Sequence, residues 1–125
     1  MNNNEVGEPM SVASEKVIIV EGRSDKEKIK KLIEEDVEII CTNGTLGVER
    51  LEYLIEDFEL DDRDVFILVD EDNAGKKLRK QLSTELPHAV HIYIDKAFRE
   101  VAATPESELA VALVASHISI YPNYL

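Results

Sequence analysis

The sequence contains few of the features that would indicate secretion or a membrane segment. Its one cysteine, Cys41, cannot form an internal disulfide, and the longest apolar runs are only about as long as a β-strand. The first fifteen residues contain neither a basic region nor an apolar region, so they do not form a signal peptide. We therefore expect a cytoplasmic protein with no membrane association and with a polar, loosely attached or disordered leader over residues 1–15.

Positive charge is also scarce, with 14 basic residues against 26 acidic ones and a net charge of −12. This balance argues against broad, sequence-blind binding of nucleic acid. The cations are unevenly placed, because six lie between Lys16 and Lys31 and four between Lys76 and Lys80. Two interpretations stay open: these segments are the solvated faces of helices, or they place positive charge beside the acidic motifs described below.

Short β-branched runs alternate with helical patterns along the chain. The runs of strand length are residues 17–20, 37–41, 65–69 and 89–94, and the last helical pattern, "PESELAVALVAS", is apolar over most of its circumference. This alternation predicts a single α/β domain over residues 16–125, including the C-terminal apolar helix and tail. Its core is an open sheet of about four mainly parallel strands with helices on both faces.

The composition of the runs predicts the order of the strands. "VIIV" and "VFILV" are apolar throughout, as expected for central strands, whereas Glu38 interrupts the second run. The fourth run alternates apolar residues with His91 and Tyr93, and we interpret His91 as a surface residue of an edge strand. The predicted order is therefore 2-1-3-4, with a topological switch point at the carboxyl ends of strands one and three.

Three carboxylates follow these two central strands. Glu21 comes directly after the first strand, and Asp70 and Asp72 come after the third. Adjacent strands are ~4.8 Å apart, so the three side chains should converge. Two carboxylates ~4 Å apart repel by ~4 kcal/mol at an effective dielectric of ~20, and oxygen ligands of this kind suit Mg²⁺. The histidines and Cys41 lack the spacing of a zinc site.

Each acid also has a structural interpretation. Ser24 to Glu27 has the pattern of a capping box, in which Asp25 is either a first-turn charge or an additional acid of the site. Asp72 or Asn73 is placed to cap the third helix.

Glycine turns follow the first two strands. Gly22 opens the turn after Glu21 and would let a phosphate or a metal approach. In "CTNGTLG", Asn43 and Gly44 form either a plain turn or a cradle of N–H groups for an anion.

Three segments resemble the Toprim domain: "VIIVEGRSDKEKIKKL", "CTNGT" and "VFILVDEDNAGKKLRKQL". They are most similar to the Toprim domains of bacterial primase and ribonuclease M5, among the small stand-alone Toprim proteins. The resemblance covers roughly residues 17–94, and its specificity comes from the order and spacing of the EGxxD and DxD elements.

The resemblance implies a Toprim-like (Rossmann-like) fold and Mg²⁺-dependent chemistry on nucleic acid, with Mn²⁺ as a substitute. That chemistry is phosphodiester hydrolysis or phosphoryl and nucleotidyl transfer. Glu21 becomes the general acid or base and a metal ligand beside Asp70 and Asp72. The implied contacts with phosphate or nucleic acid are Gly22, Arg23, Lys26, Asn43, Gly44, Gly75, Lys76 and Lys77. With a net charge of −12, we expect short or single-stranded RNA or DNA as the partner.

Several alternatives remain open. Type IA topoisomerases carry a third acid where this chain has Ala74, so topoisomerase chemistry is not expected. A phosphoacceptor receiver domain is disfavoured, because it needs an acidic pair after strand one and a lysine after strand five. A non-catalytic Toprim module that binds nucleic acid or nucleotide, as a subunit of a larger assembly, is the main alternative to an enzyme. The apolar tail over residues 108–125 either completes the core or packs against a second copy.

Overall fold

The computed structural model describes residues 14–125. Most of the predicted leader, residues 1–13, lies outside the described residues, so the leader stays a prediction. Its last two residues contact the domain: the Ser14 carbonyl accepts a hydrogen bond from Arg63 Nε at 2.8 Å, and the Glu15 carbonyl accepts one from the Asp64 N–H at 3.0 Å.

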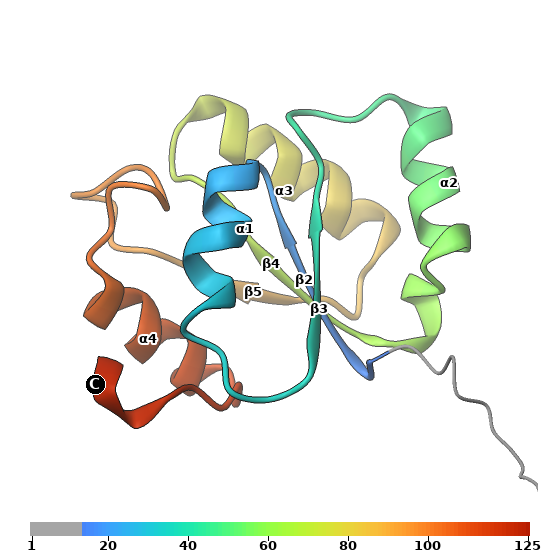
Figure 1. Ribbon diagram of the computed structural model, residues 1–125. Helices are drawn as coiled ribbons and strands as arrows, with labels where there is room; N and C mark the ends of the chain where they lie inside the picture. The colour runs from blue at the N-terminus through green and yellow to red at the C-terminus, as the bar shows by residue number, and fades with distance from the viewer. Residues whose placement is uncertain (1–13) are drawn as a thin grey trace, which may run out of the picture.

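The described residues form one four-stranded parallel sheet (Figure 1). Its strands are β2 (Lys16–Val20), β3 (Val37–Cys41), β4 (Asp64–Leu68) and β5 (Val90–Ile92). Their order is β3-β2-β4-β5, and every neighbouring pair is parallel. The predicted order 2-1-3-4 is therefore confirmed. The fourth strand is shorter than its apolar run, because Tyr93 and Ile94 lie beyond its end.

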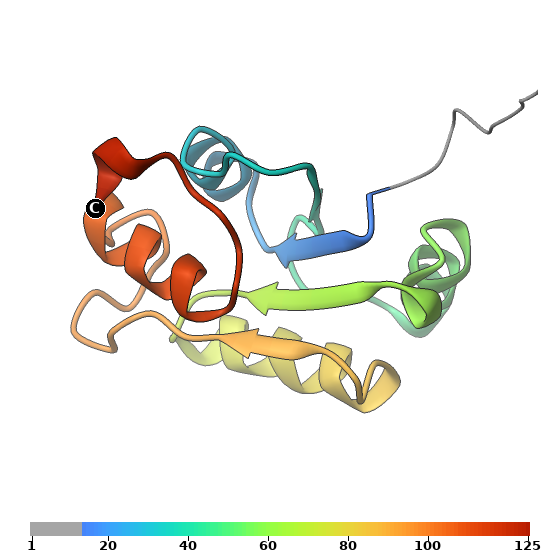
Figure 2. The same ribbon diagram turned by 90° about the horizontal axis from the view of Figure 1, so that it is seen from below.

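Four α-helices cover the sheet: α1 (Arg23–Lys30), α2 (Val48–Asp57), α3 (Asn73–Glu85) and α4 (Glu106–Ala115). Two short 3-10 helices, η1 (Leu60–Asp62) and η2 (Pro122–Tyr124), complete the elements. Successive residues of β2 point to opposite faces of the sheet. Ile18 and Val20 pack with α1 and α4, whereas Val17 and Ile19 pack with α2 and α3. Both faces of the sheet are therefore covered by helices, as Figure 2 shows.

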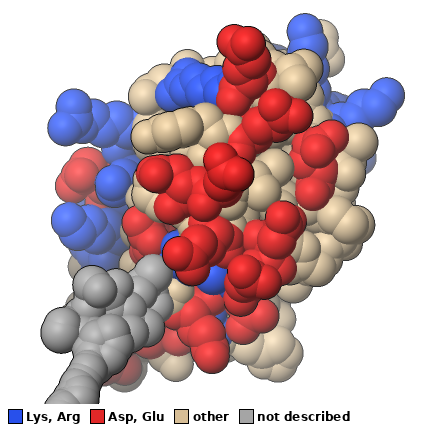
Figure 3. All heavy atoms as spheres, turned by 90° about the vertical axis from the view of Figure 1, so that its right-hand side faces the viewer, with Lys and Arg blue, Asp and Glu red and all other residues tan. Residues whose placement is uncertain are grey.

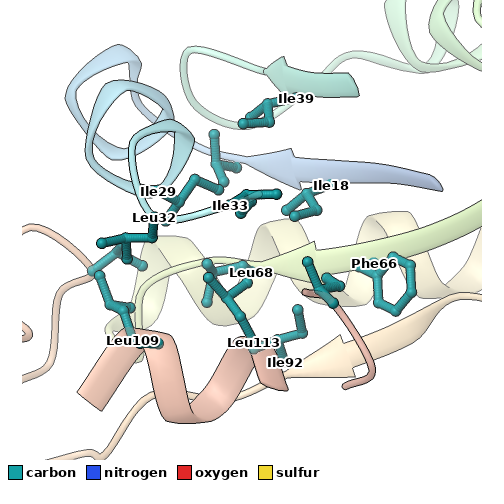
Figure 4. Packing of buried hydrophobic residues seen from close by; sticks show 14 of the residues in the cluster. Ile18, Ile29, Leu32, Ile33, Ile39, Phe66, Leu68, Ile92, Leu109 and Leu113 are labelled. Carbon is teal, nitrogen blue, oxygen red and sulfur yellow. The ribbon is translucent and has the colours of Figure 1, made fainter. Parts of the chain in front are cut away.

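The first helix begins earlier than its sequence prediction. It begins after Gly22, which is its N-cap, so the predicted capping box at Ser24 is wrong by two residues. Asp25 occupies the third helical position and accepts a hydrogen bond from the Gly22 N–H. The helix ends at Lys30, so Leu32 lies in the turn that follows the helix. Leu32 is nevertheless buried against the core, because the turn after the helix folds back onto the sheet (Figure 4).

The last helix and the tail complete the domain's own core. Leu109 and Leu113 are fully buried against the sheet. In the tail, Ile118 is also buried, and Ile120 forms an isolated antiparallel bridge with Ile33. The apolar helix is not buried all round, however, because Val111 on its outer side is 58% exposed. No helix within residues 14–125 is long and apolar enough to cross a membrane.

The two sides of α4 should respond differently to truncation. Leu113→Ala should lower the free energy of unfolding by about 2–5 kcal/mol, because it removes a fully buried side chain. Val111→Ala, on the exposed side, should change it by less than about 0.5 kcal/mol. Urea denaturation followed by circular dichroism measures both values. A large and concentration-dependent cost for Val111→Ala would contradict this expectation and indicate that a second copy covers the helix.

Candidate metal centre

Three carboxylates meet at the carboxyl ends of the two central strands. Glu21 follows β2, and Asp70 and Asp72 follow its parallel neighbour β4. Each residue offers one carboxylate oxygen, and these three oxygens lie within 4.8 Å of one another. All three residues are half-buried. The structure thus brings together the three acids that the sequence predicts to converge, at the topological switch point of the sheet.

Backbone hydrogen bonds hold Asp70 in this position. Its Oδ1 accepts a bond from the Val101 N–H at 2.8 Å. The next residue, Glu71, donates its N–H to the carbonyl of Arg99 at 2.7 Å. The segment before α4 therefore packs along the turn that follows β4 and orients its first carboxylate.

The turn from β4 into α3 is too tight for a side chain at residue 75. Asp72 is the N-cap of α3, and its Oδ1 accepts a hydrogen bond from the Gly75 N–H at 2.8 Å. A Cβ atom on Gly75 would lie 2.0 Å from the carbonyl oxygen of Asp70. Gly75 was predicted as a phosphate contact. In the structure it is buried and its N–H is already bonded, and its lack of a side chain lets the first turn of α3 lie against the Asp70 backbone.

Glu21 is the least satisfied member of the group. Its Oε1 is buried and has no hydrogen-bond partner among the described residues. Burial raises the pKa of Glu21, and the nearby charges of Asp70, Asp72 and Asp25 raise it further. The pKa of Asp70 is also raised, first by burial and then by neighbouring acids, against the bond from Val101. An unpaired buried oxygen within a group of like charges fits a divalent cation, which would offset the repulsion.

Asp25, the additional acid suggested by the sequence, lies outside this group of three. Its Oδ2 accepts the Gly22 N–H at 3.1 Å, and the residue is only 6% exposed. Burial raises its pKa, while the bond from Gly22 and the charge of Lys28 act in the opposite direction. The side chain fixes the turn between β2 and α1 and adds negative charge near Glu21.

The other predicted phosphate contacts fall into two regions. Arg23, Lys26 and Asn43 line a hollow of about 240 Å³ beside the turn after β2. The Asn43 N–H donates to the Glu21 carbonyl at 2.7 Å, so it holds that backbone and is not free for an anion. Gly44 has a φ of +109°, which makes this segment a tight glycine turn.

Lys76 and Lys77 are both exposed on α3 but face different hollows. Lys76 borders a hollow next to β5, and Lys77 borders one next to α2. The structure therefore separates two lysines that the sequence treats as one cluster.

Sequence reasoning missed the role of Arg79. This side chain is buried and donates to the carbonyls of Ile67 at 3.4 Å and Ile92 at 3.0 Å, which ties α3 to β4 and β5. Its Nη1 also lies 2.8 Å from Nδ1 of His91, and its Nη2 lies 3.6 Å from a Glu71 oxygen. His91 lies on an edge strand, as predicted, but it is half-buried and bonded to this arginine instead of being a plain surface residue. The sequence does contain an indication that Arg79 is buried, because it lies three residues before Leu82 and therefore on the same stripe of α3 that faces the core.

Comparisons with known proteins show what the chain is similar to. The family model described as "Toprim domain" matches residues 16–101. The chain is 50% identical over 111 residues to the uncharacterized protein YusF of Bacillus subtilis (strain 168), covering 89% of this chain and 75% of that protein. It is 34% identical over 94 residues to a ribonuclease M5 of Staphylococcus aureus, covering 75% of this chain and 49% of that protein.

A solved structure is also similar. The small TOPRIM domain protein from Bacillus stearothermophilus superimposes with a TM-score of 0.84 at 48% identity, covering 90% of this chain and 94% of that one. The chain spans only 49% of the ribonuclease M5 of Staphylococcus aureus and 62% of that of Mycoplasma genitalium. The family resemblance found in the sequence is confirmed by these matches.

Gly75→Ala should disturb the three acids directly. The added methyl group meets the Asp70 backbone, so we expect a loss of about 1–3 kcal/mol in stability and a weaker affinity for a divalent cation. Gly47→Ala is the matched control, because a Cβ there has nothing within 4 Å, and it should leave metal affinity unchanged. Calorimetric titration with Mg²⁺ measures the affinities. Equal affinities for the parent and Gly75→Ala would contradict the proposed role of this glycine.

The contribution of Glu21 and Asp70 to the stability of the metal-free fold should fall as pH rises. Because the pKa values of Glu21 and Asp70 are raised in the folded chain, the stability linked to them is full below about pH 4 and is lost as pH increases through the raised values. Asp70→Asn keeps an acceptor for the Val101 N–H and should be neutral or stabilising near pH 8. Denaturation in chelator between about pH 4 and pH 8 tests this, with exposed Asp61→Asn as control. A destabilisation by Asp70→Asn that grows with pH would contradict it.

Proposed function

Because the chain belongs to the Toprim family, we propose that it is a Mg²⁺-dependent enzyme that hydrolyses phosphodiester bonds in short or single-stranded RNA. The observation that carries this proposal is the convergence of Glu21, Asp70 and Asp72, with one buried oxygen of Glu21 left unpaired. The similarity to proteins named ribonuclease M5 favours RNA over DNA and hydrolysis over nucleotide joining.

The donor set fits a hard cation. Three carboxylates without histidine or cysteine suit Mg²⁺, with Mn²⁺ as a substitute, and half-burial leaves room for water and a substrate phosphate. Asp70 and Asp72 each use one oxygen to accept a backbone hydrogen bond. They would hold the ion with the oxygen lone pairs that these bonds leave free. When bound, Mg²⁺ would neutralise charge on the phosphate and lower the pKa of a coordinated water.

Glu21 is placed to handle the proton. The pKa of Glu21 is raised toward the pH of the cell, and a carboxyl group with a pKa near the working pH both accepts and returns protons efficiently. Its Oε1 has no partner within residues 14–125, so no protein hydrogen bond has to break before it accepts a proton from an attacking water. The Asn43 N–H bonded to its carbonyl keeps the backbone of Glu21 in place during this step.

Charge on the surface limits how the substrate approaches. Figure 3 shows acidic side chains gathered on the side of the molecule that carries α2, and this helix and η1 contribute the exposed acids Glu49, Glu52, Glu56, Asp57 and Asp61. A polyanion is repelled from that side. The RNA would therefore reach Glu21, Asp70 and Asp72 from the side of α1, or from the side of α3 and β5. Only a short stretch of the RNA would contact the protein there.

A second candidate is a non-catalytic module that binds RNA within a larger assembly. The observation that favours it is that the similarity to ribonuclease M5 of Staphylococcus aureus covers 49% of that protein. The remaining half of such a protein is available to contribute contacts that turnover requires.

Turnover distinguishes the two candidates. With Mg²⁺, the parent chain should cleave a labelled single-stranded RNA, and Glu21→Gln should lower the rate by about 10²- to 10⁴-fold, the usual contribution of a general acid or base. Glu49→Gln is the control, because it makes the same change on the acidic side. Gel analysis of the products measures both rates.

RNA binding without cleavage in either Mg²⁺ or Mn²⁺ would favour the module over the enzyme. Cleavage of DNA in preference to RNA of the same sequence would contradict the choice of RNA. Cleavage that persists unchanged in Glu21→Gln would contradict the assignment of the general acid or base.

A further inference from the structure

The hollow that Lys76 borders lies between α3 and the edge strand β5. It has a volume of about 470 Å³, and the side chains that carry the argument are Lys76, Arg79, Lys80, His91, Tyr93 and Lys96. We call it the α3–β5 hollow. Glu71, which also lines it, stands between Asp70 and Asp72 in the sequence, and Lys76 lies in the first turn of the helix that Asp72 caps. The hollow and the three acids therefore share one turn of the chain.

The floor of the α3–β5 hollow is rigid. Arg79 is only 9% exposed and is held by the carbonyls of Ile67 and Ile92 and by Nδ1 of His91. Since an arginine only donates, His91 accepts this bond and is neutral at Nδ1. Burial and the charge of Arg79 both lower its pKa, which keeps the ring neutral. Glu71 lies 3.6 Å from the guanidinium and offsets its charge.

Tyr93 forms an aromatic platform above this floor. The Arg79 guanidinium carbon lies 4.2 Å from the centre of the Tyr93 ring, and the His91 ring is stacked at 6.1 Å. The arginine thus packs on the tyrosine ring, yet the residue remains 60% exposed. An aromatic side chain that is fixed on one face and open on the other is suited to stacking a nucleobase, because little freedom is lost on binding.

Three lysines surround the platform. Lys76, Lys80 and Lys96 line the α3–β5 hollow, and none of them forms an ion pair with any residue from 14 to 125. In a chain with a net charge of −12, three such cations at one hollow indicate an anionic ligand. Phosphate groups on either side of a stacked base would neutralise them.

We propose that the α3–β5 hollow binds one nucleotide of a single-stranded RNA, with its base on the open face of Tyr93 and its flanking phosphates at Lys80 and Lys96. This rests on the proposed function, because the neighbouring phosphate along the strand then reaches the three acids past Lys76. The chain would select single strands, since a base paired in a duplex cannot lie flat on a tyrosine.

The test measures the affinity of a six-residue oligoadenylate with Mg²⁺ present, in a Glu21→Gln background that prevents cleavage. Tyr93→Leu, which keeps an apolar side chain beside Arg79, should lower the affinity about 5- to 100-fold, and Tyr93→Phe should retain it. Tyr53→Leu is the matched control, because Tyr53 lies on α2 and is 62% exposed; it should have no effect. Thermal unfolding checks that each variant is folded.

A second set of variants tests the charges without altering the platform. Lys80→Gln combined with Lys96→Gln should make the dependence of log affinity on log salt shallower by about 1 to 2 units, whereas Lys30→Gln on α1 should not. An unchanged affinity in Tyr93→Leu, an equal loss in Tyr53→Leu, or no binding of oligoadenylate by the background chain would each overturn the proposal.

The outcome is separable from that of the proposed function. Tyr93→Leu should leave the calorimetric affinity for Mg²⁺ unchanged, because its ring packs on Arg79 and His91, and the bonds that hold Asp70 and Asp72 come from Val101 and Gly75. If RNA is never cleaved but its binding still depends on Tyr93, the enzyme assignment fails and the nucleotide site stands. If RNA is cleaved equally well by the parent and by Tyr93→Leu, the nucleotide site fails and the enzyme stands.

Discussion

Three carboxylates held within 4.8 Å of one another repel, and the turns around them are built to withstand that repulsion. Asp70 is fixed by the Val101 N–H, and Asp72 is fixed by the N–H of Gly75. These bonds stabilise the ionised carboxylates and also restrict their movement. The repulsion therefore cannot be relieved by rotating the two aspartates toward solvent. Burial is the main cause of the raised pKa values of Glu21 and Asp70, and the persisting repulsion raises them further.

The third carboxylate is treated differently. Glu21 Oε1 receives no hydrogen bond from residues 14–125, although hydrogen bonds fix the backbone on both sides of it. A purely structural acid would be expected to find a partner, because an unpaired buried oxygen costs about 1–3 kcal/mol. This difference fits the proposed roles, in which Asp70 and Asp72 are fixed ligands of a metal ion and Glu21 takes up the proton.

Much of this arrangement could be predicted from the sequence because it depends on backbone topology. Unbroken apolar runs indicated that β2 and β4 lie in the centre, and parallel pairing then brings the acids that follow them to one edge. The start of α1 could not be fixed in the same way, because Ser24 and Gly22 are both acceptable N-caps and the choice depends on where Asp25 packs. The burial of Arg79 could not be predicted, since its contacts with Ile67 and Ile92 come from the packing of distant segments.

The side chains of the α3–β5 hollow also protect the exposed edge of the sheet. β5 is an edge strand of only three residues, and an exposed edge invites pairing with another chain. Arg79 donates a hydrogen bond to the carbonyl of Ile92, and Lys96 lies a few residues beyond the end of the strand and adds a positive charge there. Protection of the edge alone would be served by these two charges. It does not explain why Tyr93 is held flat on the arginine with its other face open, or why Lys76 and Lys80 turn toward it from α3. A polyanion with stackable bases accounts for all of these features together, and it is the class of substrate that the proposed function gives to the neighbouring acids.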